Sequence, residues 1–428
     1  MEMPIDLASI GPRAQSAIGL VAFTTIAWLF SAKKLRFPFV TAVWTIAAQI
    51  AIAALLLYVP PAQQALGSLQ VVVDALVAAT RAGTSFVFGY LGGAATPFEV
   101  SNGAAMFNFA FGALPLVIFF SGLSALLWHW GVLKIFVKGM AFLLERAFSV
   151  GGAVALSSAA NTFLGQTEAP LLIRPFLSKV TRAELFIIIT GGFATVAGSV
   201  MAVYATILAE VDPSILGHII VASIISVPAA ILMAQVMMPE DKGVTPTPAS
   251  AADDFKYASS MDAFVRGVTD GLGLYLNIIA SLIAFTAFAA LINIILSAGP
   301  DIAGAPPTLE RLLGWVFAPF MWLAGVPWSE AFNAGSLMGI KTAVNELVAY
   351  VELARQGPAA YGERSFLIIV YSLCGFANFA SLGIIIGGFT ALAPDRRQDV
   401  IELAPRALIS GTLATMMTGA VIGLIWGL

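Results

Sequence analysis

Long apolar runs separated by short polar clusters set the pattern of this chain. A helix that crosses a lipid bilayer needs about 20 predominantly apolar residues, and eight of the runs satisfy that requirement approximately. They are residues 16–31, 39–59, 109–131, 184–208, 215–238, 269–297, 365–390 and 407–427. The pattern therefore predicts an all-α integral membrane protein with eight transmembrane helices.

Three further apolar segments fit poorly as spans. Residues 68–92 carry Asp74 and Arg81 in an amphipathic pattern, which is typical of a helix that lies at the membrane interface. Residues 150–178 and 327–356 are rich in glycine, serine, asparagine and threonine. We expect each of these two to form a re-entrant helical hairpin, because irregular backbone at membrane depth must be satisfied by protein or water.

The basic residues test this topology, because cytoplasmic loops carry an excess of lysine and arginine. With the amino terminus outside, most of the 21 lysines and arginines fall on the cytoplasmic side. That bias holds only if each hairpin enters and leaves on one side, the first from the cytoplasm and the second from outside. The pattern thus predicts that the two hairpins enter the membrane from opposite sides and that both chain termini lie outside.

The same arrangement reveals an internal inverted repeat. Each hairpin is followed by two spans, and we expect helix breaks within residues 191–198 and 375–381. Inverted repeats with broken helices and a central site are typical of secondary transporters. The chain then divides into four parts: scaffold helices with the interfacial helix (1–148), a first transport repeat (149–238), a cytoplasmic loop with further scaffold helices (239–326) and a second transport repeat (327–428).

Composition supports the membrane class. Of the 428 residues, 59% are hydrophobic and only 11% are charged, which excludes an ordinary soluble domain. The net charge of −3, without a long basic run, gives no signal for nucleic-acid binding. The single cysteine, Cys374, excludes an internal disulfide.

The first hairpin contains Gln166, Thr167 and Glu168 in succession. A charge at membrane depth costs at least ~2.5–3.5 kcal/mol, so such a group normally lines an aqueous cavity and carries function. Together the three side chains offer hydrogen-bond donors and acceptors, an inventory that suits a planar heterocycle. The alternative for Glu168 is a structural carboxylate that closes the helix ends of the hairpin.

The second hairpin contains Glu346 beside Asn345, and the next span contains Asn378 and Ser381. A carboxylate with an amide can bind vicinal hydroxyls such as those of a ribose, whereas hydrogen bonding between helices is the alternative for Asn378 and Ser381. Lys341 is expected either to pair with a carboxylate or to extend to the membrane interface.

Asn161, with backbone carbonyls near Leu164, Thr195 and Val196, could surround a small hard cation. Broken helices expose carbonyls of this kind, and such carbonyls coordinate sodium in other transporter folds. The alternative is that Asn161 caps a helix.

Five stretches match the motifs of a known family in the family's order, which is far more specific than one short pattern. They are GQTEAPLLIRPF (165–176), AGSV (197–200), NELVAY (345–350), CGFANFASLGIIIGG (374–388) and RALISGTLA (406–414). From about residue 85 to its end, the chain resembles the concentrative nucleoside transporters. It departs from the family's commoner residues at Leu347 and Ala380.

The resemblance implies a symporter that imports nucleosides with sodium or protons, and a homotrimer in which a scaffold part holds a mobile transport part. Asn161 favours sodium, because proton-coupled relatives tend to have serine there. The implied contacts are Gln166, Thr167 and Glu168 to the base, Glu346, Asn378 and Ser381 to the ribose, Phe376 beside the sugar, and Asn161, Leu164, Thr195 and Val196 to sodium. We expect a multi-pass protein surrounded by lipid in a bacterial inner membrane, with both termini periplasmic.

Two other function classes compete with this prediction. An intramembrane enzyme could use Glu168 and Glu346 as acid and base, but the sequence shows no nucleophile, metal cluster or phosphate loop to support one. A channel would be expected to have a continuous polar pathway, whereas the polar residues here cluster in two inverted motifs. The sequence therefore favours a transporter over an enzyme.

Overall fold

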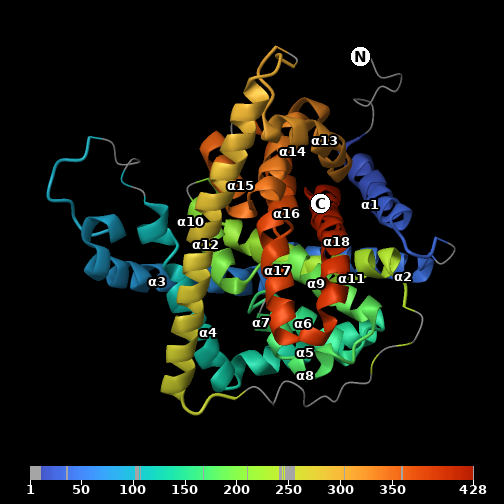
Figure 1. Ribbon diagram of the computed structural model, residues 1–428, viewed down its shortest axis with the longest axis horizontal. Helices are drawn as coiled ribbons and strands as arrows, with labels where there is room; N and C mark the ends of the chain where they lie inside the picture. The colour runs from blue at the N-terminus through green and yellow to red at the C-terminus, as the bar shows by residue number, and fades with distance from the viewer. Residues whose placement is uncertain are drawn as a thin grey trace.

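The computed structural model is helical throughout its described part, with one isolated β-bridge between Ile302 and Ala305 (Figure 1). It describes residues 11–34, 37–101, 106, 108–166, 168–209, 211–240, 243, 245, 256–302, 304–357 and 360–427. The α-helices are α1 (Pro12–Leu29), α2 (Phe39–Tyr58), α3 (Pro60–Phe88), α4 (Leu116–His129), α5 (Val132–Phe148), α6 (Gly152–Asn161), α7 (Glu168–Leu171), α8 (Arg174–Leu177), α9 (Arg182–Ala194), α10 (Gly198–Leu208), α11 (Ile215–Met237), α12 (Ser260–Ser297), α13 (Leu309–Ala324), α14 (Trp328–Ala343), α15 (Glu346–Gln356), α16 (Glu363–Leu373), α17 (Phe379–Leu392) and α18 (Arg397–Ile425). Short 3₁₀ turns at Gly89–Gly92 and Pro394–Arg396 and a π turn at Phe109–Ala113 join them. The predicted all-α membrane fold is confirmed.

Within the described residues, 7 helical stretches are long and apolar enough to cross a bilayer. They are Phe39–Tyr58, Pro60–Gly92, Phe109–His129, Arg182–Leu208, Ile215–Met237, Ser260–Ser297 and Pro394–Ile425. All except Pro60–Gly92 coincide with spans that the sequence predicts.

The remaining predicted spans differ from the structure in instructive ways. The span predicted at 16–31 is α1, whose first turn carries Arg13, Gln15 and Ser16 and makes the helix too polar to meet the criterion for a span. The span predicted at 365–390 is two helices, α16 and α17, separated by an unwound segment.

The segment predicted as interfacial, 68–92, belongs to a longer helical stretch that begins at Pro60. Asp74 and Arg81 are the only charges in that stretch, so its length and composition would also allow it to span. In Figure 1, however, α3 runs crosswise to the long helix α12. Its interfacial placement stays a prediction.

The helices fall into an inner and an outer group by burial. The share of residues that are buried in an apolar 18-residue segment differs between these stretches. It is 94% for α9–α10 and 83% for α18, but only 6% for α3 and 6% for α12. Helices α9, α10 and α18 of the two repeats therefore lie in the interior, while α3 and α12 present apolar faces outward. This contrast agrees with the predicted division into transport and scaffold parts, which stays a prediction.

The order of elements repeats between the halves. The series α5, α6, α7–α8, the broken helix α9/α10 and α11 corresponds to α13, α14, α15, the broken helix α16/α17 and α18. The predicted hairpins coincide with the helix–turn–helix units α6–α8 and α14–α15. The breaks lie at 195–197 and 374–378, which confirms the predicted interruptions of both helices.

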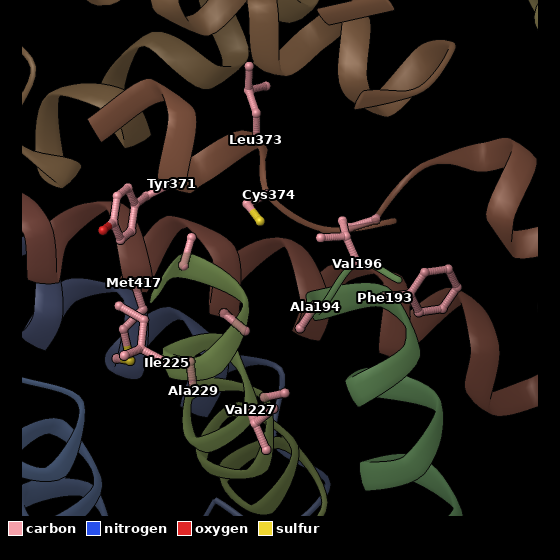
Figure 2. Close-up of a cluster of buried hydrophobic side chains, with 14 of the residues drawn as sticks. Phe193, Ala194, Val196, Ile225, Val227, Ala229, Tyr371, Leu373, Cys374 and Met417 are labelled. Carbon is pink, nitrogen blue, oxygen red and sulfur yellow. The ribbon is translucent and has the colours of Figure 1, made fainter. Parts of the chain in front are cut away.

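The two breaks contact each other at the centre of the protein. The backbone N–H of Phe376 donates to the carbonyl of Thr195 at 3.4 Å. Figure 2 shows Phe193 and Ala194 at the end of α9 and Val196 of the first break near Leu373 at the end of α16 and Cys374 of the second break, against α11 and α18. The unwound segments therefore meet in an apolar core.

Gly375 sets how closely the breaks approach. A Cβ atom there would lie 2.9 Å from the carbonyl oxygens of Phe193 and Ala194 and 2.6 Å from Cγ2 of Thr415. We expect Gly375→Ala to lower the free energy of unfolding by ~1–3 kcal/mol through overpacking, and so to lower the thermal midpoint in detergent. The matched control is Gly387→Ala on the exposed face of α17, where nothing lies within 4 Å. That control should leave the midpoint unchanged or raise it, because alanine favours helix over glycine by about 1 kcal/mol; equal midpoints for both variants would contradict the close approach.

The two ends of the described chain lie together. The guanidinium of Arg13 donates to the carbonyl of Gly427 at 2.7 Å, and Arg364 donates to the carbonyls of Pro12 and Gly423 at 2.7 and 3.0 Å. The start of α1 and the end of α18 are thus on one side of the molecule, as the predicted topology requires. Which side faces the periplasm stays a prediction.

Candidate functional site

A cavity lies where the two repeats meet α4 and α12. Its walls come from the turn after α6, from α10, from the start of α15 and from the second break with α17. The lining residues are Leu114, Val117, Gly165, Gln166, Glu168, Ala197, Val200, Val203, Tyr204, Leu274, Asn277, Ile278, Ser281, Asn345, Glu346, Leu347, Phe376, Asn378, Ala380, Ser381 and Ile384. All the predicted substrate contacts that the structure describes are among them, while Thr167 lies outside the described residues.

The carboxylate of Glu346 is oriented in the cavity by hydrogen bonds from two side chains. Glu346 is the first residue of α15, and only 5% of it is exposed. Its Oε1 accepts a hydrogen bond from the Tyr204 hydroxyl at 2.5 Å, and its Oε2 accepts one from Nδ2 of Asn378 at 2.7 Å. Each carboxylate oxygen can accept further hydrogen bonds, so the group is oriented and still able to bind a ligand.

Two helix amino termini support this half of the cavity. Asn345 caps α15 by accepting from Val348 N at 3.0 Å, and Asn378 caps α17 by accepting from Ser381 N at 2.7 Å. Helix amino termini favour negative charge, which stabilises the Glu346 carboxylate at this position. The alternative reading of Asn378 as a bridge between helices is also partly true, since its amide joins α17 to α15.

Glu168 forms the opposite, first-repeat side. It begins α7 and borders both this cavity and a second one that contains Asp270. The turn before it depends on Gly165, whose φ of +131° disfavours other residues and whose Cβ would lie 2.5 Å from Oε2 of Glu168. The Oε1 of Gln166 is buried and has no hydrogen-bond partner in the described part of the chain. The first hairpin therefore contributes an amide oxygen and a carboxylate to the site.

Asn161 ends α6 and joins it to the first break. Its Nδ2 donates to the carbonyl of Gly191 at 2.9 Å and to Oγ1 of Thr195 at 2.6 Å. The adjoining turn meets the same break, because Gly198 N donates to the carbonyl of Phe163 at 3.2 Å. The structure thus brings Asn161 to Thr195 and places Leu164 and Val196 in the turn and the break that these bonds connect.

The oxygens in this region fit a hard cation. Among the residues that the structure describes, the Oδ1 of Asn161 is buried without a hydrogen-bond partner, and so are the hydroxyls of Ser158, Thr162 and Thr190. An unsatisfied buried polar group costs ~1–3 kcal/mol, and oxygen atoms of this kind are the ligands that hard cations prefer. Helix capping alone does not explain Asn161, because its amide N–H groups donate to Gly191 of α9 and to Thr195 of the first break, while its side-chain oxygen accepts no hydrogen bond from the described residues.

Three functional candidates were not apparent from the sequence. Tyr204 holds Glu346 from α10, where it interrupts an apolar run, and Asn277 and Ser281 face the cavity from α12. The i, i+4 spacing of Asn277 and Ser281 is the signal that could have identified them, since such residues share a helix face.

The prediction that Lys341 extends to the membrane interface is wrong, whereas its ammonium does interact electrostatically with a carboxylate, that of Glu346. The Lys341 side chain is fully buried, so it does not extend to the interface. Its Nζ donates to the carbonyl of Ser372 at 2.8 Å and to Oγ1 of Thr415 at 3.0 Å rather than to a carboxylate. The break after α16 frees the carbonyl of Ser372, and α18 supplies the hydroxyl of Thr415; a local sequence pattern reveals neither acceptor.

Family comparisons cover most of the chain. Residues 218–423 match the family described as Na+ dependent nucleoside transporter C-terminus, residues 18–91 match its N-terminus, and residues 110–211 match a family described as nucleoside recognition.

Curated relatives align along almost the whole chain. An uncharacterized transporter of Haemophilus influenzae is 40% identical over 419 residues, covering 96% of this chain and 98% of that protein. The nucleoside permease NupC of Helicobacter pylori is 33% identical over 420 residues, covering 96% and 98%.

Solved structures share the fold. CNTnw in an inward-facing substrate-bound state is 36% identical with a TM-score of 0.87, covering 96% of this chain and 99% of that chain. A variant of CNTnw in an outward-facing state is 35% identical with a TM-score of 0.87, covering 96% and 97%.

Proposed function

The chain belongs to the family of Na+-dependent nucleoside transporters, and from this premise we propose that it is a symporter that imports nucleosides with sodium as the coupling ion. Its relatives are transporters, so it is a transporter rather than an enzyme. Its long apolar helices make it a multi-pass membrane protein. We place it in a bacterial inner membrane with both termini periplasmic.

The observation that carries this proposal is the convergence of two carboxylates from opposite repeats on one cavity. Glu346, oriented by Tyr204 and Asn378, would accept the hydroxyl protons of a ribose. Ser381 would add a hydroxyl, and Phe376 would pack beside the sugar. On the other side, Gln166, Thr167 and Glu168 would bind the edge of the base.

Sodium would act on the base side of the site. An ion bound by Asn161, Thr195 and the carbonyls of Leu164 and Val196 would tie the end of α6 to the first break. Gln166 and Glu168 follow in the same turn, so the ion would order the groups that contact the base. Sodium and nucleoside would then each strengthen the binding of the other by the same factor.

Transport requires the cavity to open alternately to the two sides. We propose that the two repeats move against a scaffold of residues 1–148 and 239–326. The contact surface supports this proposal, because Asn277 and Ser281 of α12 complete a cavity whose other polar groups belong to the repeats. The outward face of α12 is apolar, and only 6% of the residues in its apolar 18-residue segment are buried. We therefore assign this face of α12 to contact with lipid and to the interface of a homotrimer.

Removing the ion ligand tests this function. In Asn161→Ala we expect the sodium concentration for half-maximal uridine binding to rise at least about tenfold, because a hydrogen-bonding group to a charge contributes ~1.5–3 kcal/mol. Isothermal titration in sodium chloride against choline chloride measures this change. Uridine affinity extrapolated to saturating sodium should stay near that of the parent, which serves as the internal control.

Two outcomes would contradict the sodium assignment. One is an unchanged sodium dependence in Asn161→Ala. The other is a parent protein whose uridine binding follows pH and ignores sodium, which would favour the proton-coupled alternative.

A further inference from the structure

Lys341 is a buried cation that the proposed function leaves unexplained. It lies in the last turn of α14, and its side chain has 0% exposure. Among the residues that the structure describes, no other lysine or arginine is classed as buried. A charge in this position requires compensating partners, so its surroundings define what it does.

Those surroundings are the carboxyl end of a broken helix. Ser372, whose carbonyl accepts from Nζ at 2.8 Å, is in the last turn of α16. The N–H that would continue the helix to this carbonyl belongs to Phe376, and it donates instead to Thr195. Carbonyls at a helix carboxyl terminus lack intrahelical partners and carry partial negative charge, which favours a cation.

The first repeat has a corresponding contact at the corresponding place. There Asn161, at the end of α6, donates to Gly191 in the last turn of α9. Several oxygens around Asn161 lack a hydrogen-bond partner among the described residues. By contrast, both oxygens that accept from the Lys341 ammonium, those of Ser372 and Thr415, are hydrogen-bonded. One repeat therefore presents acceptors to an external cation, and the other already contains a cation.

We propose that the ammonium of Lys341 is a tethered cation, which holds the α14–α15 turn against the second break as the coupling ion would hold the α6–α8 turn against the first. This inference rests on the proposed function. Lys341 is thus a positioning residue for Glu346, which begins α15 just after the turn that follows α14. The ribose side of the site would be held permanently, and only the base side would depend on sodium.

An ordinary ion pair with Glu346 does not account for the geometry. The carboxylate is held by Tyr204 and Asn378, while the ammonium is held by Ser372 and Thr415. The two groups have separate hydrogen-bond partners, although their opposite charges also attract each other. The cation therefore acts on Glu346 through the position of the turn between α14 and α15 as well as through this attraction.

Two substitutions separate charge from hydrogen bonding. Lys341→Met removes both and keeps an unbranched side chain, while Lys341→Gln keeps N–H donors and removes the charge. Lys256→Met, at an exposed lysine before α12, is the matched control. For each protein we would measure uridine affinity at saturating sodium, and also the sodium concentration that gives half of the thermal stabilisation without nucleoside.

We expect both Lys341 variants to bind uridine at least about tenfold more weakly, because removing one member of a buried charge system is strongly unfavourable. The sodium response without nucleoside should stay within about twofold of the parent, since independent sites act additively. The Lys256 variant should match the parent in both measurements.

Parental uridine affinity in Lys341→Gln would overturn the proposal, because hydrogen bonding without charge would then suffice. A parallel loss of the sodium response and of uridine binding would also overturn it, by showing general structural damage. Failure of the proposed function is seen separately, as a parent protein that binds no nucleoside at any sodium concentration.

Discussion

Glu346→Gln is expected to weaken uridine binding by roughly 100-fold or more. The carboxylate accepts hydrogen bonds from both Tyr204 and Asn378, and glutamine offers one oxygen where two are used. Its NH₂ group would face one of these donors, and the charge that binds the ribose hydroxyls would be lost. Hydrogen bonds to charged groups contribute ~1.5–3 kcal/mol each, so the loss of two corresponds to at least two decades in affinity.

Sugar analogues show whether the lost energy belongs to the ribose. The parent should bind 2′- and 3′-deoxyuridine more weakly than uridine, and Glu346→Gln should reduce that difference. Glu352→Gln is the control, because Glu352 lies on the same helix but pairs with Arg355 at 2.6 Å. Ribose assignment would be contradicted if Glu346→Gln kept the full penalty for the deoxy sugars.

Glu168→Gln is expected to change the choice of base rather than the choice of sugar. Buried groups built to bind a substrate reject analogues that leave them unpaired, at ~1–3 kcal/mol per group, so relative affinities for uridine, cytidine and adenosine should shift about tenfold. The penalty for deoxy sugars should stay as in the parent. Competition binding with base-modified and sugar-modified nucleosides to both glutamate variants measures the contrast.

Two results would contradict the assignment of the base to the first hairpin and of the ribose to the second. If Glu168→Gln and Glu346→Gln show the same selectivity profile, the two carboxylates do not serve different parts of the substrate. Free bases that compete as well as nucleosides would also contradict it, because the ribose side would then contribute nothing.

The sequence predicted the features that interrupt an apolar pattern. The glycines within residues 191–198, and the glycine, asparagine and serine within residues 375–381, predicted the two breaks, because such residues disfavour continuous helix. Isolated acids within apolar surroundings similarly predicted Glu168 and Glu346, since burial of a charge requires a reason. Both now line one cavity.

Features that depend on distant partners could not be predicted. In the sequence, Tyr204 is one aromatic residue in an apolar span. Its role follows only from the hydrogen bond that it donates to Glu346, which is 142 positions away. The hydrogen bond from Lys341 to Ser372 could not be predicted, because this carbonyl is available only after a distant helix breaks. The orientation of the helix at 68–92 in the membrane likewise depends on distant contacts. Its composition would allow it to span the bilayer, and its packing against other helices decides whether it lies at the interface.

The most direct test of sodium-driven nucleoside import is radiolabelled uridine uptake into proteoliposomes. With an inward sodium gradient, uridine should accumulate above its external concentration, and the accumulation should disappear when choline replaces sodium or when the gradient is dissipated. The account would be contradicted by uridine that only equilibrates across the membrane, or by accumulation that is the same with and without sodium.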